Sequence, residues 1–184
     1  MISLDALNAA SQAQFVDMLG GIYEHSSWIA GAAWEKRPFS NLVTLKLALI
    51  DAVRNASDDA QLGLIRVHPE LAGKAMVSKS LTAESAAEQS RAGLTHCTPV
   101  EFEKIQQLNA EYNAKCGFPF ILAVRGPRAS GLSRTTIIET FSRRLQNHPD
   151  FERGECLRNI HRIAELRLDD AFGEVPARGN QVWD

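Results

Sequence analysis

The chain has 184 residues, a length that fits one domain with a single buried core. Its 20 basic and 22 acidic side chains give a formal charge of −2, which argues against a protein that binds nucleic acid through a broad phosphate-neutralising surface. No apolar run is long enough to span a bilayer, so we expect no membrane partner.

The first half of the chain is predicted to be helical, because apolar residues recur there every three or four positions. One such face is formed by Phe15, Met18, Leu19 and Ile22, and another by Leu42, Leu45, Leu49 and Val53. A further helix is predicted from Asp58 to Val67. Pro69 ends it, because a proline disfavours the helical backbone in the residue before it.

The second half is also mainly helical. Thr98, Pro99 and Glu101 provide an N-cap, a first-turn proline and a capping-box acid for a helix that stops at Gly117. A last long helix begins near Pro149 and carries Leu157, Ile160, Ala164 and Leu168 on its inner face. Only the apolar run 118–124 is predicted to be extended, and one run cannot form a sheet. We therefore predict an all-α fold, with residues 1–184 forming one helical bundle of about seven to nine helices.

Two short segments carry residues suited to acid–base chemistry. His68 is expected at a helix exit, where the partial negative charge of the last carbonyls favours the imidazolium and suits a proton carrier. Ser85, Glu88 and Gln89 stand at i, i+3 and i+4, so they share one flank of a helix and can line one pocket. The alternative is that His68 only terminates its helix and that the other three form a solvated face.

A series of ordered motifs spans roughly residues 15 to 172. In chain order they are residues 19–26, 28–30, 37–39, the run His68-Pro69-Glu70-Leu71-Ala72-Gly73-Lys74, residues 85–89 with 92–94, Leu108-Asn109 with Tyr112, residues 117–121, residues 124–126 and residues 163–168. Together they resemble the family of 2-oxo-4-hydroxy-4-carboxy-5-ureidoimidazoline (OHCU) decarboxylases. Such enzymes complete the conversion of urate to (S)-allantoin, and the resemblance implies a carboxy-lyase of purine breakdown.

The resemblance also implies a set of site residues. The catalytic residues would be His68, Glu88 and Arg167. Arg162 is the alternative candidate for the catalytic arginine. The substrate-binding residues would be Pro69, Ser85, Ala86, Ala87, Gln89, Phe120, Ile121, Leu122, Ala123 and Val124. The last five would contact the substrate largely through main-chain atoms, although a buried connector that packs Phe118, Phe120 and Ile121 into the core is an alternative that can hold at the same time.

The chemistry of this substrate explains why no cofactor or metal is predicted. The carbon that loses CO₂ neighbours a ring C=N bond, which can accept the departing electron pair, so pyridoxal phosphate, thiamine or a metal is not needed. His68 would exchange a proton with the substrate hydroxyl, and Glu88 would orient the reacting groups. The alternative for Arg167 is a helix-surface ion pair with Glu165, Asp169 or Asp170.

The remaining expectations concern surface, compartment and partners. Arg125, Arg128, Arg134, Arg143 and Arg144 are interpreted as a solvated face and loop. The amino terminus lacks a secretory signal, and Cys97, Cys116 and Cys156 are too widely spaced for zinc, so we expect reduced cysteines in the cytoplasm. The family resemblance suggests a homodimer. Two other classes stay open: a noncatalytic helical interaction module, and a hydrolase or isomerase of a related ureido heterocycle.

Overall fold

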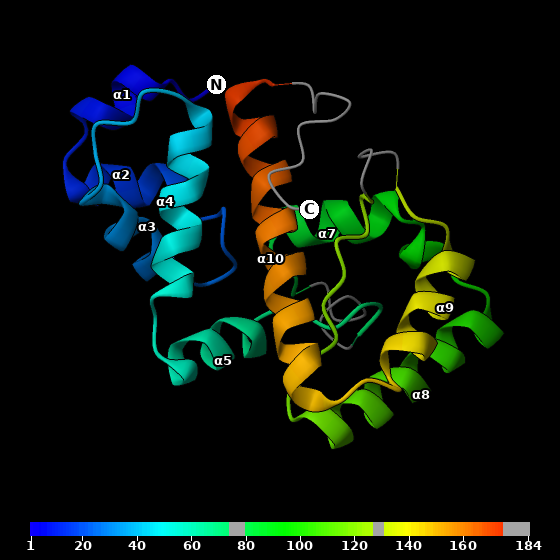
Figure 1. The fold of residues 1–184 in the computed structure, drawn as a ribbon. Coiled ribbons are helices and arrows are strands. Elements are labelled where there is room, and N and C mark those ends of the chain that lie inside the picture. Colours follow the sequence, from blue (N-terminus) through cyan, green and yellow to red (C-terminus); the bar gives the residue numbers. More distant parts are fainter. Residues whose placement is uncertain (74–79, 127–130, 175–184) are drawn as a thin grey trace. The chain divides into compact units, whose positions relative to one another are not determined.

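The computed structural model describes residues 1–73, 80–126 and 131–174, so Lys74 lies outside the described residues. Within these ranges the chain forms nine α-helices, one 3₁₀ turn and no strand (Figure 1). The helices are α1 (Leu4–Ala9), α2 (Gln12–Leu19), α3 (Ser27–Trp34), α4 (Leu42–Arg54), α5 (Asp58–Arg66), α7 (Ala83–Arg91), α8 (Pro99–Cys116), α9 (Arg134–Arg144) and α10 (Pro149–Phe172), and the 3₁₀ turn is η1 (Leu94–His96). The predicted all-α class is confirmed.

The chain separates into two compact units. Unit 1 contains residues 1–64 and the chain from His161 onward, and unit 2 contains residues 65–160. Both α5 and α10 therefore contribute residues to each unit. A single domain stays a prediction.

Unit 1 is built on the apolar faces predicted from the sequence. The predicted face of α4 is buried, and α3 packs against both α2 and α4. Ser11 and Asn41 each form a capping box at the start of α2 and α4, which satisfies backbone N–H groups that a helix leaves unpaired. Residues near the start of the chain meet the end of α10 in this unit, where the Ile2 N–H donates to the Ala171 C=O at 3.0 Å.

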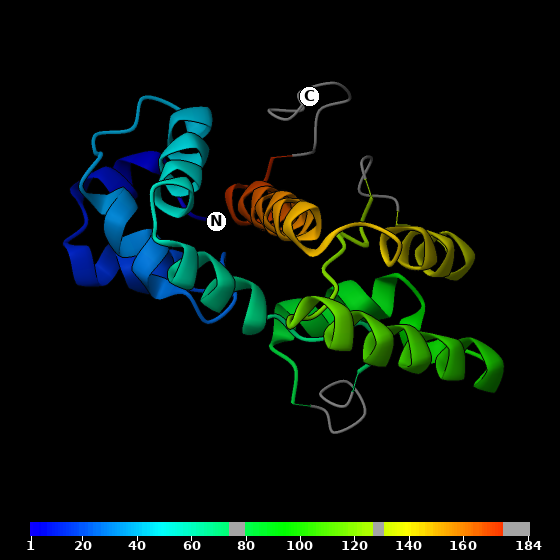
Figure 2. The same cartoon turned by 60° about the horizontal axis from the view of Figure 1, so that its bottom comes forward.

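Unit 2 is built around an aromatic core. Tyr112 makes edge-on contacts with Phe118, Phe120 and Phe141, and Phe120 stacks on Phe141 with ring centroids 3.8 Å apart. Because Tyr112 lies on α8 and Phe141 on α9, these contacts pack the two helices together, as the green and yellow ribbons show (Figure 2). Phe118 and Phe120, in the segment that follows α8, are thereby held in the core.

The sequence signals at the ends of α8 are confirmed. Thr98 and Glu101 form the capping box, Pro99 occupies the first turn, and Gly117 ends the helix with a φ of 76°. That left-handed conformation favours glycine, which has no side chain to clash with the backbone. Across the described ranges, no helix is both long and apolar enough to cross a membrane.

Candidate active site

His68 lies just beyond the end of α5, as the sequence predicts. The helix ends at Arg66, and the His68 N–H donates to the Ile65 C=O at 3.2 Å, which closes a final turn before Pro69. The His68 side chain is 7% exposed, so it is a buried group at a helix exit. This position combines burial with the partial negative end of a helix, which suits a residue that exchanges protons.

The turn that follows His68 is fastened by carboxamide side chains from α7 and α8. The Gln89 Oε1 accepts the Ala72 N–H at 2.9 Å, and the Gln89 Nε2 donates to the Glu70 C=O at 3.3 Å. The Gln106 Nε2 donates to the Ala72 C=O at 2.7 Å, and the Asn109 Nδ2 donates to the Leu71 C=O at 3.0 Å. Ala72 has a φ of 48°, a conformation that L residues rarely adopt, and these bonds hold it there.

The predicted flank of α7 faces the interior in part. Ser85 and Gln89 are buried, at 5% and 4% exposure, whereas Glu88 is half-buried and Ala86 and Ala87 are exposed. The helix begins at Thr82, whose hydroxyl accepts the Ser85 N–H at 3.3 Å. A solvated face is therefore wrong for Ser85 and Gln89. The structure brings Gln89 against the turn beside His68.

The segment predicted to bind substrate through its main chain is held by side chains of unit 2. The Arg144 Nη1 donates to the Ile121 C=O at 2.7 Å, and the Ala123 N–H donates to the Asn159 Oδ1 at 3.0 Å. The side chains of residues 118–121, 123 and 124 are buried, and that of Leu122 is half-buried. The alternative of a buried connector is confirmed for its packing, while substrate binding stays a prediction.

A buried ion pair lies beneath this segment, and sequence reasoning missed it. The Arg144 Nη2 is 2.7 Å from the Glu152 Oε2, and both side chains are almost fully buried. The Tyr112 hydroxyl donates to the same oxygen at 2.5 Å, and the Asn147 Nδ2 donates to the Glu152 Oε1 at 2.7 Å. The expected solvated position is wrong for Arg144, because its partner stands on another helix and no local pattern marks the pair.

The burial and hydrogen bonds of this network shift its pKa values. Burial acts to raise the pKa of Glu152, but hydrogen bonds from Arg144, Tyr112 and Asn147 outweigh it and leave that pKa below its usual range. Burial raises the pKa of Tyr112, so the phenol keeps its proton. Arg144 also stacks 4.4 Å over the Phe120 ring, which ties the charge pair to the aromatic core.

Arg167 belongs to unit 1, whereas the other predicted site residues belong to unit 2. Its guanidinium is 3.0 Å from the Glu24 Oε2, and its Nη1 donates to the Gly21 C=O at 3.2 Å. The side chain is only 7% exposed, so the surface ion pair considered from the sequence is wrong. Two of the three acids proposed as partners are engaged by other cations, Asp169 by Lys46 at 2.6 Å and Glu165 by Arg162 at 2.6 Å.

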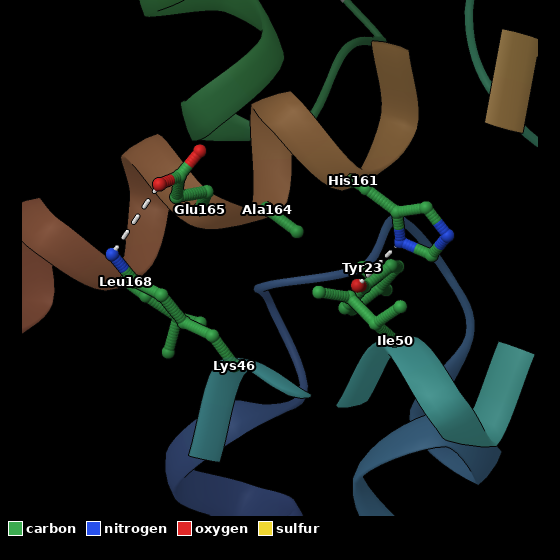
Figure 3. A pocket seen from close by; sticks show the side chains of 7 residues that line it. All are labelled: Tyr23, Lys46, Ile50, His161, Ala164, Glu165 and Leu168. Carbon is green, nitrogen blue, oxygen red and sulfur yellow. Dashed lines mark hydrogen bonds and ion pairs between the residues drawn. The ribbon is translucent and has the colours of Figure 1, made fainter. Parts of the chain in front are cut away.

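A small hollow in unit 1 brings together polar groups that were not among the predicted site residues (Figure 3). It is lined by Tyr23, Lys46, Ile50, His161, Ala164, Glu165 and Leu168. The Tyr23 hydroxyl is 2.9 Å from the His161 Nδ1, and the Lys46 Nζ is 3.6 Å from the Glu165 Oε1. Its cavity volume of about 10 Å³ is the space of one water molecule, so it is too small for a heterocyclic substrate.

The His161 and Tyr23 side chains in this hollow are both uncharged near neutral pH. Burial, with a contribution from the positive charge of Arg54, lowers the pKa of His161 to about 4. Burial raises the pKa of Tyr23. Across the described ranges there is no cluster of three or more histidine, cysteine or acidic residues that could hold a metal ion.

Comparisons with known proteins identify the family. The family model for OHCU decarboxylase matches residues 8–169. The chain is 41% identical over 171 residues to the 2-oxo-4-hydroxy-4-carboxy-5-ureidoimidazoline decarboxylase of Mus musculus, covering 91% of each chain. A crystal structure of (S)-allantoin synthase superposes with a TM-score of 0.72 at 29% identity, over 92% of this chain and 54% of that one. A crystal structure of OHCU decarboxylase in the presence of (S)-allantoin has the same fold, with a TM-score of 0.65 at 19% identity over 90% of this chain and all of that one. The chain therefore belongs to the OHCU decarboxylase family.

Proposed function

We propose that this protein converts OHCU to (S)-allantoin by decarboxylation, as a carboxy-lyase of urate breakdown. The observation that carries the proposal is the family match across residues 8–169, which includes the buried His68 and the inward-facing Ser85 and Gln89. Relatives that share this match over nearly their whole length bear the name of that activity.

The reaction itself assigns the roles. As the C–C bond to the carboxylate breaks, its electron pair passes into the neighbouring ring C=N bond and CO₂ leaves. His68 exchanges a proton with the substrate hydroxyl, whose oxygen becomes the C=O of allantoin, and Glu88 orients the reacting groups. A proton added to the neighbouring ring carbon completes the (S) product. Because the substrate supplies its own electron sink, we propose that no cofactor takes part.

The main-chain and amide groups of unit 2 would recognise the substrate. Gln89 uses one Nε2 hydrogen on the Glu70 C=O, and its second hydrogen suits a ring or ureido oxygen. Pro69 would shape the wall beside His68, and Ser85 would contact the ureido amide. Arg167 would stabilise charge as it develops, because an ion pair that held the departing carboxylate most strongly in the ground state would oppose formation of neutral CO₂.

The product formed from freshly generated substrate tests this proposal. In the experiment, 5-hydroxyisourate is supplied with its hydrolase, and circular dichroism and mass spectrometry follow the products with and without this protein. We expect rapid formation of optically active (S)-allantoin with release of CO₂. A different ureido product would favour the hydrolase or isomerase, and no change in rate or chirality would favour the noncatalytic module.

We also propose that the protein is a cytoplasmic homodimer. The family resemblance supports the dimer, and three unpaired cysteines support a reducing compartment. Sedimentation equilibrium at micromolar concentration should give twice the mass of the 20.3 kDa chain. A constant monomer mass over that range would contradict the dimer.

A further inference from the structure

Two side chains fix the peptide groups on either side of Leu122. The buried Arg144, at the end of α9, donates from Nη1 to the Ile121 C=O at 2.7 Å. Asn159 on α10 accepts the Ala123 N–H at 3.0 Å, and its Nδ2 donates to the Glu155 C=O at 2.9 Å. Because Asn159 is bound at both ends of its carboxamide, the direction of its Oδ1 is set by its own helix.

Because peptide bonds are planar, these two contacts also determine the directions of the Leu122 N–H and C=O groups. In a trans peptide the C=O and the following N–H point in opposite directions. Both peptides at Leu122 are trans, since the cis peptide of the described chain is Arg37-Pro38. The Ile121 C=O points at Arg144, so the Leu122 N–H of that peptide points away from it. The Ala123 N–H points at Asn159, so the Leu122 C=O of the same peptide points away from Asn159.

Leu122 thus presents a donor and an acceptor, both directed away from the side chains that hold its neighbours. Within residues 1–73, 80–126 and 131–174, neither group has a hydrogen-bond partner. Leu122 is also half-buried, whereas residues 118–121, 123 and 124 are buried. A neighbouring donor and acceptor match the edge of an amide or ureido group, which carries one of each.

We propose that Asn159, together with Arg144, is a positioning residue that aims the main-chain N–H and C=O of Leu122 at the amide or ureido edge of the substrate. This inference rests on the proposed function. Asn159 acts through Ala123 and does not itself contact substrate. The consequence is that recognition at this segment depends on one side-chain acceptor on α10.

Asn159 offers a matched pair of variants. Asn159→Ala removes the acceptor for the Ala123 N–H. Asn159→Asp keeps an acceptor at the same position but loses the donor to the Glu155 C=O, so it separates the two bonds of the carboxamide. We expect Asn159→Ala to weaken binding of (S)-allantoin and to raise KM by about tenfold, with kcat within about threefold of wild type, and Asn159→Asp to restore both.

The measurements are calorimetric titration with (S)-allantoin, kinetics on OHCU and thermal melts of each variant. If Asn159→Ala does not fold, Asn159→Ser removes the same reach with less change in polarity and carries the same expectation. Wild-type binding by the alanine or serine variant overturns the inference, and so does equal weakening by Asn159→Asp. Absence of turnover by the wild-type protein overturns the proposed function and this inference with it, so the two failures are distinguishable.

Discussion

At the scale of single residues, Gln89 shows how one side chain can hold the turn beside a predicted catalytic residue. Its carboxamide spans the turn after His68, with the Oε1 on Ala72 and the Nε2 on Glu70. The turn includes the left-handed Ala72, so these bonds oppose a backbone strain of order 1 kcal/mol. His68 is therefore followed by a backbone whose position is fixed, which is what the proposed proton transfer requires.

Replacing His68 tests its role in proton transfer directly. His68→Asn removes the titratable ring but keeps a polar side chain, and we expect turnover to fall by about 10²-fold or more. Far-ultraviolet circular dichroism should remain that of the wild type, because the residue lies outside α5. Near-normal kcat in a folded variant would exclude His68 from the mechanism.

The relation between Glu88 and His68 calls for a double-mutant cycle. If the two act as a unit, Glu88→Gln should reduce kcat strongly, and the variant combined with His68→Ala should be little worse than the worse single change. Ser90→Ala, at an exposed position of α7 outside the proposed substrate-binding set, is the matched control for changes on this helix. Effects that multiply would give Glu88 a separate binding role.

At the scale of elements, the buried pair of Arg144 and Glu152 joins α9 to α10 and holds the Ile121 C=O of the segment that follows α8. The Tyr112 hydroxyl and the Asn147 amide complete the coordination of the carboxylate. Ion pairs of this kind add little net free energy compared with apolar packing, but loss of one partner leaves an uncompensated charge in the core. The network therefore fixes the position of the Ile121 carbonyl more than it stabilises the fold.

Substitution of Glu152 tests this view. Glu152→Gln keeps the shape and removes the charge, so we expect the free energy of unfolding in urea to fall by about 3–5 kcal/mol. The control is Asp51→Asn, which breaks the exposed pair with Arg54 and should change little. Equal effects of the two substitutions would contradict the special role of burial.

The pH dependence of stability in Glu152→Gln is a second test of the buried pair. The folded pKa of Glu152 is depressed below 4.5, so its contribution is present above that pH and is lost as the pH falls through the folded pKa. Urea midpoints measured from pH 6 downward should fall less steeply for Glu152→Gln than for the wild type. Parallel curves would show that the carboxylate is not stabilised by folding.

At the scale of the whole molecule, unit 1 is made of two separated segments of the chain, whereas unit 2 is one continuous segment. Unit 1 needs residues 1–64 and the end of α10, and the Ile2 N–H bonds to the Ala171 C=O across almost the full length. The family match at residues 8–169 also includes residues of both units. Completion of unit 1 must therefore wait until α10 is present.

Global stability should also depend on the protonation of His161. Its folded pKa of about 4 lies below the ordinary 6.5, so the unfolded chain binds a proton first as the pH falls. The contribution of neutral His161 to the free energy of unfolding is therefore complete above pH 6.5. It is lost between pH 6.5 and pH 4, and the loss is up to about 3 kcal/mol. His161→Asn, with an oxygen near the position of Nδ1, should flatten this part of the curve in urea titrations. The exposed His148→Asn is the control, and a wild-type slope in His161→Asn would contradict the assignment.

The absence of a cofactor is testable on the whole protein. Dialysis against a chelator, followed by gel filtration, should leave kcat unchanged, because the ring C=N bond of the substrate accepts the electron pair. Recovery of lost activity by a metal or by pyridoxal phosphate would overturn this mechanism. The control is the same treatment without the chelator.

The sequence alone determined the helix faces and helix ends, because these features depend on residues that are close together in the chain. Apolar spacing indicated α4, the capping box and Gly117 marked the ends of α8, and Pro69 placed His68 at a helix exit, because caps and prolines act within a few residues. The ordered motifs likewise indicated the family, and the match at residues 8–169 confirmed it.

Tertiary structure alone decided which polar groups meet. Arg167 finds Glu24 143 positions away, Arg144 changes from an expected surface residue to the centre of a buried pair, and Asn159 reaches the backbone of Ala123 from 36 positions away. Periodicity reports only which side of a helix is buried. It contains no information about the partner that a buried charge or amide will have, because that partner is fixed by the packing of distant helices.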